Sequence, residues 1–184
     1  HTLLNLGSVA IGFSLSISIG IINFLASFLL WLYSNQLKRL PFVGNLVVAL
    51  LTGTTLILVS EYFGDKKYLI ACYAVFAAFI TLIREIIKDM EDMKGDERFG
   101  CKTIPIIYGI PKTKKIIYVI AAAFLVTVFL MISHISMILP ITLTLALIFL
   151  IFGLAKADTV KAFSRLSTWS KIIMLLGVIS MVWI

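Results

Sequence analysis

Three aspartates near the middle of the chain have the spacing of a metal-binding stripe. Asp89, Asp92 and Asp96 follow one another at intervals of three and four residues, which places their carboxylates along one face of an α-helix. Mg²⁺ takes a few protein carboxylates, several waters and the oxygens of a substrate phosphate. The stripe therefore predicts a site for a metal-diphosphate complex, with Gly95 ending the helix so that Asp96 turns back toward the other two.

The same segment has a second interpretation. Mixed acids and bases are common on the solvated face of a helix end, where Asp89 and Asp92 would simply balance Lys88 and Lys94. The spacing alone leaves both interpretations open. The position of the cluster at the end of an apolar run favours the metal site, because ionisable groups at membrane depth are costly and are candidates for function.

A second polar cluster precedes another apolar run. Lys38 and Arg39 could neutralise a diphosphate, with Tyr33 and Asn45 adding hydrogen bonds. Two basic residues at the end of an apolar run are also typical topology anchors. Taken alone, this cluster does not distinguish the two roles.

The elements that position these residues are membrane helices. The 184 residues are 61% hydrophobic and 14% charged, with a mean hydropathy of +1.09, whereas a soluble domain is roughly 45–50% apolar and 25% charged. About 20 apolar residues cross the bilayer core. The charge-free runs predict an all-α, polytopic transmembrane bundle with seven spans, at residues 2–18, 20–37, 43–61, 67–90, 114–133, 138–155 and 168–184.

Two breaks inside long apolar runs produce this number of spans. The first run is expected to break near Ser18 and Gly20. The second is expected to break around Ser133, His134 and Pro140, since proline suits the first turn of a helix and disrupts its interior.

The basic residues predict the orientation of the bundle. Fourteen of the sixteen Lys and Arg residues fall in or beside the loops after spans two, four and six, and Lys66 and Lys67 fall on the other side. The positive-inside rule places these three loops in the cytoplasm, which predicts a multi-pass protein of the cell membrane. This loop bias explains the net charge of +7 without nucleic acid, and we expect the lipid bilayer but no obligate protein as a partner.

Two longer motifs resemble a known family. Residues 33–53 read YSNQLKRLPFVGNLVVALLTG and residues 84–109 read REIIKDMEDMKGDERFGCKTIPIIYG. In this order and separation they resemble the UbiA-type intramembrane prenyltransferases, most of all the archaeal digeranylgeranylglyceryl phosphate synthases. The resemblance implies that the chain corresponds to spans three to nine of a nine-helix bundle.

The resemblance also implies a reaction and a set of site residues. The expected reaction is Mg²⁺-dependent transfer of a geranylgeranyl group from geranylgeranyl diphosphate to geranylgeranylglyceryl phosphate, a lipid-like acceptor, forming the second ether bond of archaeal membrane lipid. Asp92 and Asp96 match the catalytic DxxxD core of the family's second aspartate motif, and Asp89 matches the additional aspartate of its longer version. All three are implied metal ligands. The implied diphosphate contacts are Tyr33, Lys38, Arg39 and Lys102.

The family's first aspartate motif has no counterpart before the first span. We therefore expect residues 1–184 to be a single transmembrane prenyltransferase domain that lacks its N-terminal part, with natural sequence upstream of His1. If that part were truly deleted, we would expect no catalysis, because half of the metal site would be missing.

Other functions remain as alternatives. The same fold could prenylate an aromatic acceptor such as a hydroxybenzoate or a quinone precursor. An ion-coupled transporter is more remote, because transporter sites usually lie near the bilayer midplane and these acids gather at one interface. A CDP-alcohol phosphotransferase would need a Gly and an Ala-Arg pair after its early aspartates, and the segment after Asp89 does not supply them.

Overall fold

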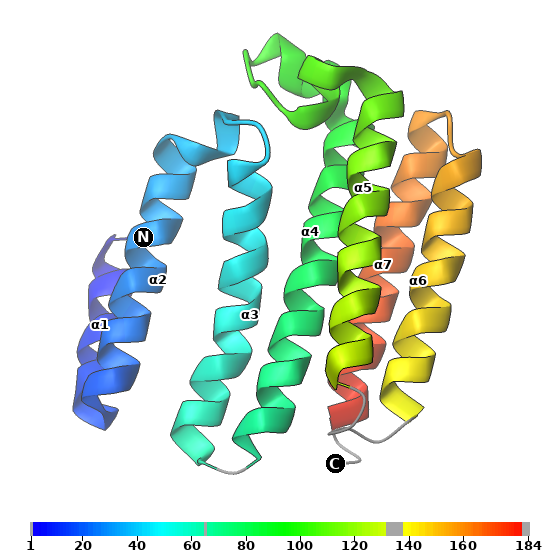
Figure 1. Cartoon of the computed structure of the whole chain (residues 1–184). Helices are drawn as coiled ribbons and strands as arrows, with labels where there is room; N and C mark the ends of the chain where they lie inside the picture. Colours follow the sequence, from blue (N-terminus) through cyan, green and yellow to red (C-terminus); the bar gives the residue numbers. More distant parts are fainter. Residues whose placement is uncertain (1, 65, 132–137, 182–184) are drawn as a thin grey trace.

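The computed structural model describes residues 2–64, 66–131 and 138–181, which form α-helices, one short 3₁₀-helix and no strand. Figure 1 shows the long helices side by side and joined alternately at the two ends of the bundle. In chain order they are α1 (Thr2–Leu15), α2 (Ile17–Asn35), the 3₁₀-helix η1 (Leu37–Arg39), α3 (Val43–Phe63), α4 (Lys67–Arg98), α5 (Ile104–Met131), α6 (Ile138–Lys156) and α7 (Val160–Ser180). The predicted all-α class is confirmed, while the predicted break at Ser133 and His134 lies outside the described residues.

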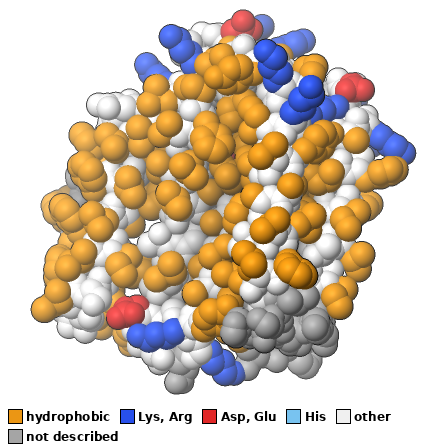
Figure 2. Space-filling model, in the orientation of Figure 1, with side chains coloured by type: hydrophobic (Ala, Val, Ile, Leu, Met, Phe, Trp, Pro, Cys, Tyr) orange, Lys and Arg blue, Asp and Glu red, His pale blue; other side chains and the backbone are white. Residues whose placement is uncertain are grey.

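Five of these helices are long and apolar enough to cross a membrane, namely α2, α3, α4, α5 and α7. Helix α1 and the segment Pro140–Lys156 of α6 are apolar but shorter. Figure 2 shows hydrophobic side chains over most of the molecular face, with charged side chains gathered toward its two ends. An apolar surface of this extent requires a lipid environment, so the protein is an integral membrane protein.

The first two helices separate at Ser16, which corrects the predicted break near Ser18 and Gly20. Ser16 has an extended backbone, with φ −165° and ψ 148°. Gly20 lies inside α2, where an added Cβ would collide with the ring of Phe13 on α1. Gly20 therefore allows α1 and α2 to pack closely and does not interrupt the helix.

Helix α5 begins ten residues before the predicted span 114–133. It starts at Ile104 and bends at Gly109, which has a φ of 76° and a ψ of 164°. Pro111 follows this bend and cannot donate a backbone hydrogen bond. The predicted span left out this first part of the helix, because basic residues directly follow it and end the charge-free run.

Helix α7 also begins earlier than the predicted span 168–184. It starts at Val160, and the hydroxyl of Thr159 accepts a hydrogen bond from the Ala162 N–H at 3.3 Å. This N-cap satisfies a backbone donor that the helix start leaves free. The helix therefore includes a charged first turn that a charge-free window cannot detect.

Helix α4 is the central element of the bundle. In the apolar stretch of α4 that is long enough to cross a membrane, 56% of the residues are buried, whereas 6% are buried in the corresponding stretch of α2. It packs against α3, α5 and α7, and Phe76 meets Phe124 of α5 edge-to-face with 5.6 Å between ring centroids. Helices in lipid associate through close packing, so α4 is the surface against which its neighbours are placed.

Helix α3 approaches α4 closely at Gly53. A Cβ at this position would lie 3.1 Å from the Ala74 carbonyl oxygen and 3.5 Å from the Cβ of Ala78. The contact holds α3, which follows the basic cluster, against the helix that carries the aspartates.

Replacing Gly53 with Leu should force α3 away from α4 and lower the melting temperature in detergent by several degrees, given the roughly 1–3 kcal/mol cost of overpacking. Gly95→Leu is the matched control, because nothing lies within 4 Å of the Cβ that it adds. Thermal unfolding followed by circular dichroism compares the two. A Gly53→Leu protein that melts at the wild-type temperature would contradict the close approach.

Candidate metal and diphosphate site

Helix α4 keeps all three aspartates on one continuous helix. It runs past Gly95, so the prediction that Gly95 ends it before Asp96 is wrong. The helix closes at Gly100, which has a left-handed φ of 70°. The Gly100 N–H donates to the Glu97 carbonyl at 3.1 Å, and the Cys101 N–H donates to the Asp96 carbonyl at 3.0 Å. This pair of bonds is a Schellman motif. Because the helix continues as far as this motif, helical periodicity alone places Asp96 on the stripe.

A backbone hydrogen bond joins the two loops that carry the polar clusters. The Lys102 N–H donates to the Arg39 carbonyl at 3.1 Å. On the other side of η1, a Cβ added to Gly44 would lie 3.0 Å from the Leu37 carbonyl oxygen. The 3₁₀-helix is therefore held between the start of α3 and the segment that follows α4.

The two loops enclose a polar cavity of about 390 Å³. Its walls come from α2, η1, the end of α4 and the segment that follows α4. The lining residues are Tyr33, Lys38, Arg39, Glu85, Lys88, Asp89, Asp92, Asp96, Phe99, Cys101 and Thr103. Carboxylates and basic side chains thus line one cavity at an end of the bundle.

Two contacts organise the carboxylates. The buried Asn45 on α3 donates from Nδ2 to Asp89 Oδ2 at 2.8 Å, which orients this carboxylate and uses one of its oxygens. Lys88 Nζ lies 3.8 Å from Asp92 Oδ2. A metal or substrate at this site would therefore meet one positioned aspartate and one that is balanced by a nearby lysine.

Thr103 contributes a polar group without a partner. Its side chain is 6% exposed, and its Oγ1 is buried with no hydrogen-bond partner among the described residues. A buried hydroxyl that is left unpaired costs roughly 1–3 kcal/mol. Because Thr103 lines the polar cavity, this unpaired hydroxyl lies beside the space that a ligand would occupy.

The donor set fits a magnesium ion that is shared with a substrate. Among the described residues, no group of three His, Cys, Asp or Glu side chains is arranged to surround a metal by itself. Asp89, Asp92 and Asp96 nevertheless line the same cavity. Mg²⁺ keeps several waters and is bound through one or two carboxylates plus phosphate oxygens, which these residues and a diphosphate could supply together.

The cavity brings together six of the seven residues that the resemblance implied as metal ligands or diphosphate contacts. Lys102 is the exception, because its side chain is exposed and is not part of the lining. Its contact with a diphosphate stays a prediction, whereas its backbone joins the loops.

Lys88 and Thr103 line the cavity although the sequence did not predict them as site residues. Lys88 lies four residues before Asp92, a spacing that pairs charges on a helix and could have indicated its place. Thr103 directly follows Lys102, but its burial could not be deduced from the sequence.

Comparison with known proteins identifies relatives that agree with one another in family. The sequence profile of the UbiA prenyltransferase family matches residues 1–179. A digeranylgeranylglyceryl phosphate synthase of Pyrococcus furiosus is 35% identical over 143 residues, which are 77% of this chain and 47% of that protein. A synthase of the same name from Methanosphaera stadtmanae is 42% identical over 110 residues, or 60% of this chain and 40% of that protein.

A solved structure shares the fold. It is described as giving insight into digeranylgeranylglyceryl phosphate synthase in membranes, and it matches 96% of this chain and 65% of its own with a TM-score of 0.80 and 23% identity. The chain thus spans only part of the length of the relatives it matches. Because the family profile covers nearly all of the chain, this protein belongs to the UbiA prenyltransferase family.

Proposed function

We propose that the protein transfers a geranylgeranyl group from geranylgeranyl diphosphate to geranylgeranylglyceryl phosphate in a Mg²⁺-dependent reaction. The observation that carries this proposal is the polar cavity, which the three aspartates of α4 line together with Lys38 and Arg39 of η1. The names of the relatives support the choice of substrates. The product would carry the second ether bond of archaeal membrane lipid.

In this proposal the aspartates hold the metal and the cations hold the diphosphate. Asp92 and Asp96, together with Asp89 as oriented by Asn45, would hold Mg²⁺. When bound, Mg²⁺ supplies positive charge that stabilises the diphosphate as it leaves.

The basic residues of η1 and the hydroxyl groups of the cavity complete the diphosphate site. Lys38 and Arg39 would bind phosphate oxygens through charge-assisted hydrogen bonds. Tyr33 and the unpaired Thr103 hydroxyl would donate further bonds, and Lys102 remains a predicted contact.

The chemistry is substitution at the allylic carbon. The C–O bond to the diphosphate breaks, and the electron pair leaves with the diphosphate. The acceptor hydroxyl oxygen then forms a bond to the allylic cation and releases its proton, which gives an ether. Surrounding helices exclude water that would otherwise capture the cation.

We further propose that the polar cavity opens toward the cytoplasm in the cell membrane. The connections after α2, α4 and α6 lie at the same end of the bundle (Figure 1), and the basic residues concentrate there. The positive-inside rule supports this orientation. Both substrates would then present their phosphates to the cavity and their hydrocarbon chains to the bilayer.

The experiment that tests this function uses the full-length protein in detergent with labelled geranylgeranyl diphosphate. Mg²⁺ or EDTA is added, together with either geranylgeranylglyceryl phosphate or 4-hydroxybenzoate. We expect Mg²⁺-dependent label in a diether phosphate. Label in a prenylated hydroxybenzoate would contradict the proposed acceptor, and transfer to neither acceptor would contradict the proposed reaction.

Replacing Asp92 or Asp96 with Ala should reduce the turnover of that reaction by at least about 100-fold, because the charge that helps to stabilise the departing diphosphate is lost. The melting temperature should change little, since neither side chain is buried. Glu97→Ala is the control, as Glu97 is an exposed acid beside Asp96 that does not line the cavity. Wild-type turnover in either aspartate variant would refute the metal assignment.

A further inference from the structure

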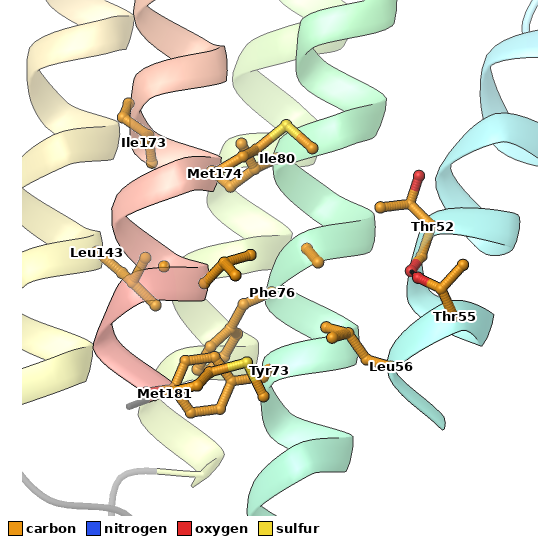
Figure 3. A pocket seen from close by; sticks show the side chains of 13 residues that line it. Thr52, Thr55, Leu56, Tyr73, Phe76, Ile80, Leu143, Ile173, Met174 and Met181 are labelled. Atoms are coloured by element: carbon orange, nitrogen blue, oxygen red, sulfur yellow. Dashed lines mark hydrogen bonds between the residues drawn. The ribbon is translucent and has the colours of Figure 1, made fainter. Parts of the chain in front are cut away.

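A second cavity lies deeper in the bundle, between α3, α4, α6 and α7 (Figure 3). It has a volume of about 120 Å³. We call it the apolar chamber, and its lining includes Thr52, Leu56, Tyr73, Phe76, Ile80 and Met181. A cavity of roughly 150 Å³ with an apolar lining stays dry and binds a hydrocarbon ring. The chamber is therefore large enough for the end of a hydrocarbon chain.

The hydroxyl groups on the chamber wall are already paired. Thr52 Oγ1 donates to the Val48 carbonyl at 2.9 Å, and Thr55 Oγ1 donates to the Thr52 carbonyl at 2.7 Å. A polar occupant would lose its hydrogen bonds to water without regaining them from these donors. The chemistry of the wall therefore favours a hydrocarbon such as an isoprenoid chain.

Tyr73 and Met181 form one end of the chamber, away from Ile80 and Met174 (Figure 3). Tyr73 is 5% exposed, and its hydroxyl lies 3.0 Å from Ser180 Oγ. Ser180 donates its single hydroxyl proton to the Gly177 carbonyl at 2.7 Å, so Tyr73 is the donor to Ser180. This chain of two hydrogen bonds joins α4 to α7 and fixes the tyrosine ring across the end of the chamber.

Another cavity shares this ring as part of its lining. It has a volume of about 210 Å³, and Tyr73 and Met181 line it as well as the chamber. Val59, Phe63 and Leu69 are among its other lining residues. Tyr73 and Met181 are thus a partition between two spaces, and removal of the tyrosine ring would join them.

The distance from Asp89, the aspartate nearest to Tyr73 along α4, to this partition matches an isoprenoid chain. Asp89 and Tyr73 are sixteen residues apart on the continuous helix α4, which is about 24 Å along the axis. An extended geranylgeranyl chain is about 18 Å long at roughly 1.2 Å per bond. The diphosphate would occupy the first few ångströms of the distance from Asp89 to Tyr73. One more isoprenoid unit, about 5 Å, would reach the tyrosine ring.

We propose that Tyr73, held in place by Ser180, is the floor that limits the length of the isoprenoid chain accepted by the enzyme. The inference rests on the proposed function, because a substrate diphosphate must bind near the aspartates. The donor and the acceptor both carry such a chain, and the chamber could receive either one.

The test measures kcat/KM of the full-length enzyme with donors of 15, 20 and 25 carbons at a fixed acceptor, and then with acceptors of matching chain lengths at a fixed donor. Tyr73→Ala should raise the preference for the 25-carbon over the 20-carbon chain at least about tenfold. Ala77→Phe, which fills the chamber one turn from Tyr73 on α4, should instead shift the preference toward the 15-carbon chain. The substrate series that shifts identifies which chain enters the chamber.

Two controls separate the ring from its surroundings. Tyr73→Phe keeps the ring and should keep the wild-type chain-length profile. Tyr62→Ala makes the same change as Tyr73→Ala at an exposed tyrosine outside the chamber and should also leave the profile unchanged.

The outcomes distinguish the two proposals. A wild-type enzyme that transfers no donor would refute the proposed function. A wild-type enzyme that is active, with unchanged chain-length profiles in both the Tyr73→Ala and Ala77→Phe variants, would refute the floor and leave the proposed function intact. Because these substitutions change the chamber volume in opposite directions, a general loss of stability cannot imitate the expected pair of shifts.

Discussion

The fold and the site both depend on the continuity of α4. This helix of 32 residues packs against three neighbours with its apolar part and carries the aspartates on its polar end. Its backbone hydrogen bonds are satisfied within the helix, as the bilayer requires, and the Schellman motif at Gly100 closes it after the last aspartate. A break near Gly95 would separate Asp96 from the stripe and would also release the segment that pairs with η1.

The sequence was most informative where the physical signal was local. Helical periodicity was enough to place Asp89, Asp92 and Asp96 on one face, and the charge-free runs located the ends of the described helices to within ten residues. Errors arose where packing overrides local preference. Gly20 was predicted to lie near a helix break, but in the structure it lies within α2 and allows Phe13 to pack against it. The first turn of α7 was not predicted, because it is charged and the prediction relied on charge-free runs.

The site itself could be predicted only in part, because its key contacts join distant segments. The hydrogen bond from Asn45 to Asp89 spans 44 residues, and the bond from Lys102 to Arg39 uses backbone atoms that any residue provides. The resemblance to the family pointed to residues that line one cavity, with Lys102 as the exception. It gave no signal for the unpaired Thr103 hydroxyl, whose importance comes from burial in the folded chain.

The division of the interior suits a substrate with two chemically different ends. Charged groups gather at the end of the bundle that holds the polar cavity, where the phosphate of a substrate would stay near water. The chamber lies deeper and offers hydrocarbon packing. Helix α4 lines both spaces, so one rigid element sets the separation between the head group and the end of the chain.

We propose that the aspartate stripe and the basic residues of η1 bind a metal-diphosphate complex together. The most direct measurement is calorimetric binding of a non-reactive thio analogue of geranylgeranyl diphosphate to the full-length protein, with Mg²⁺ and with EDTA. We expect the analogue to bind at least about tenfold more tightly with Mg²⁺ than with EDTA. Equal affinity in Mg²⁺ and EDTA would contradict the proposal.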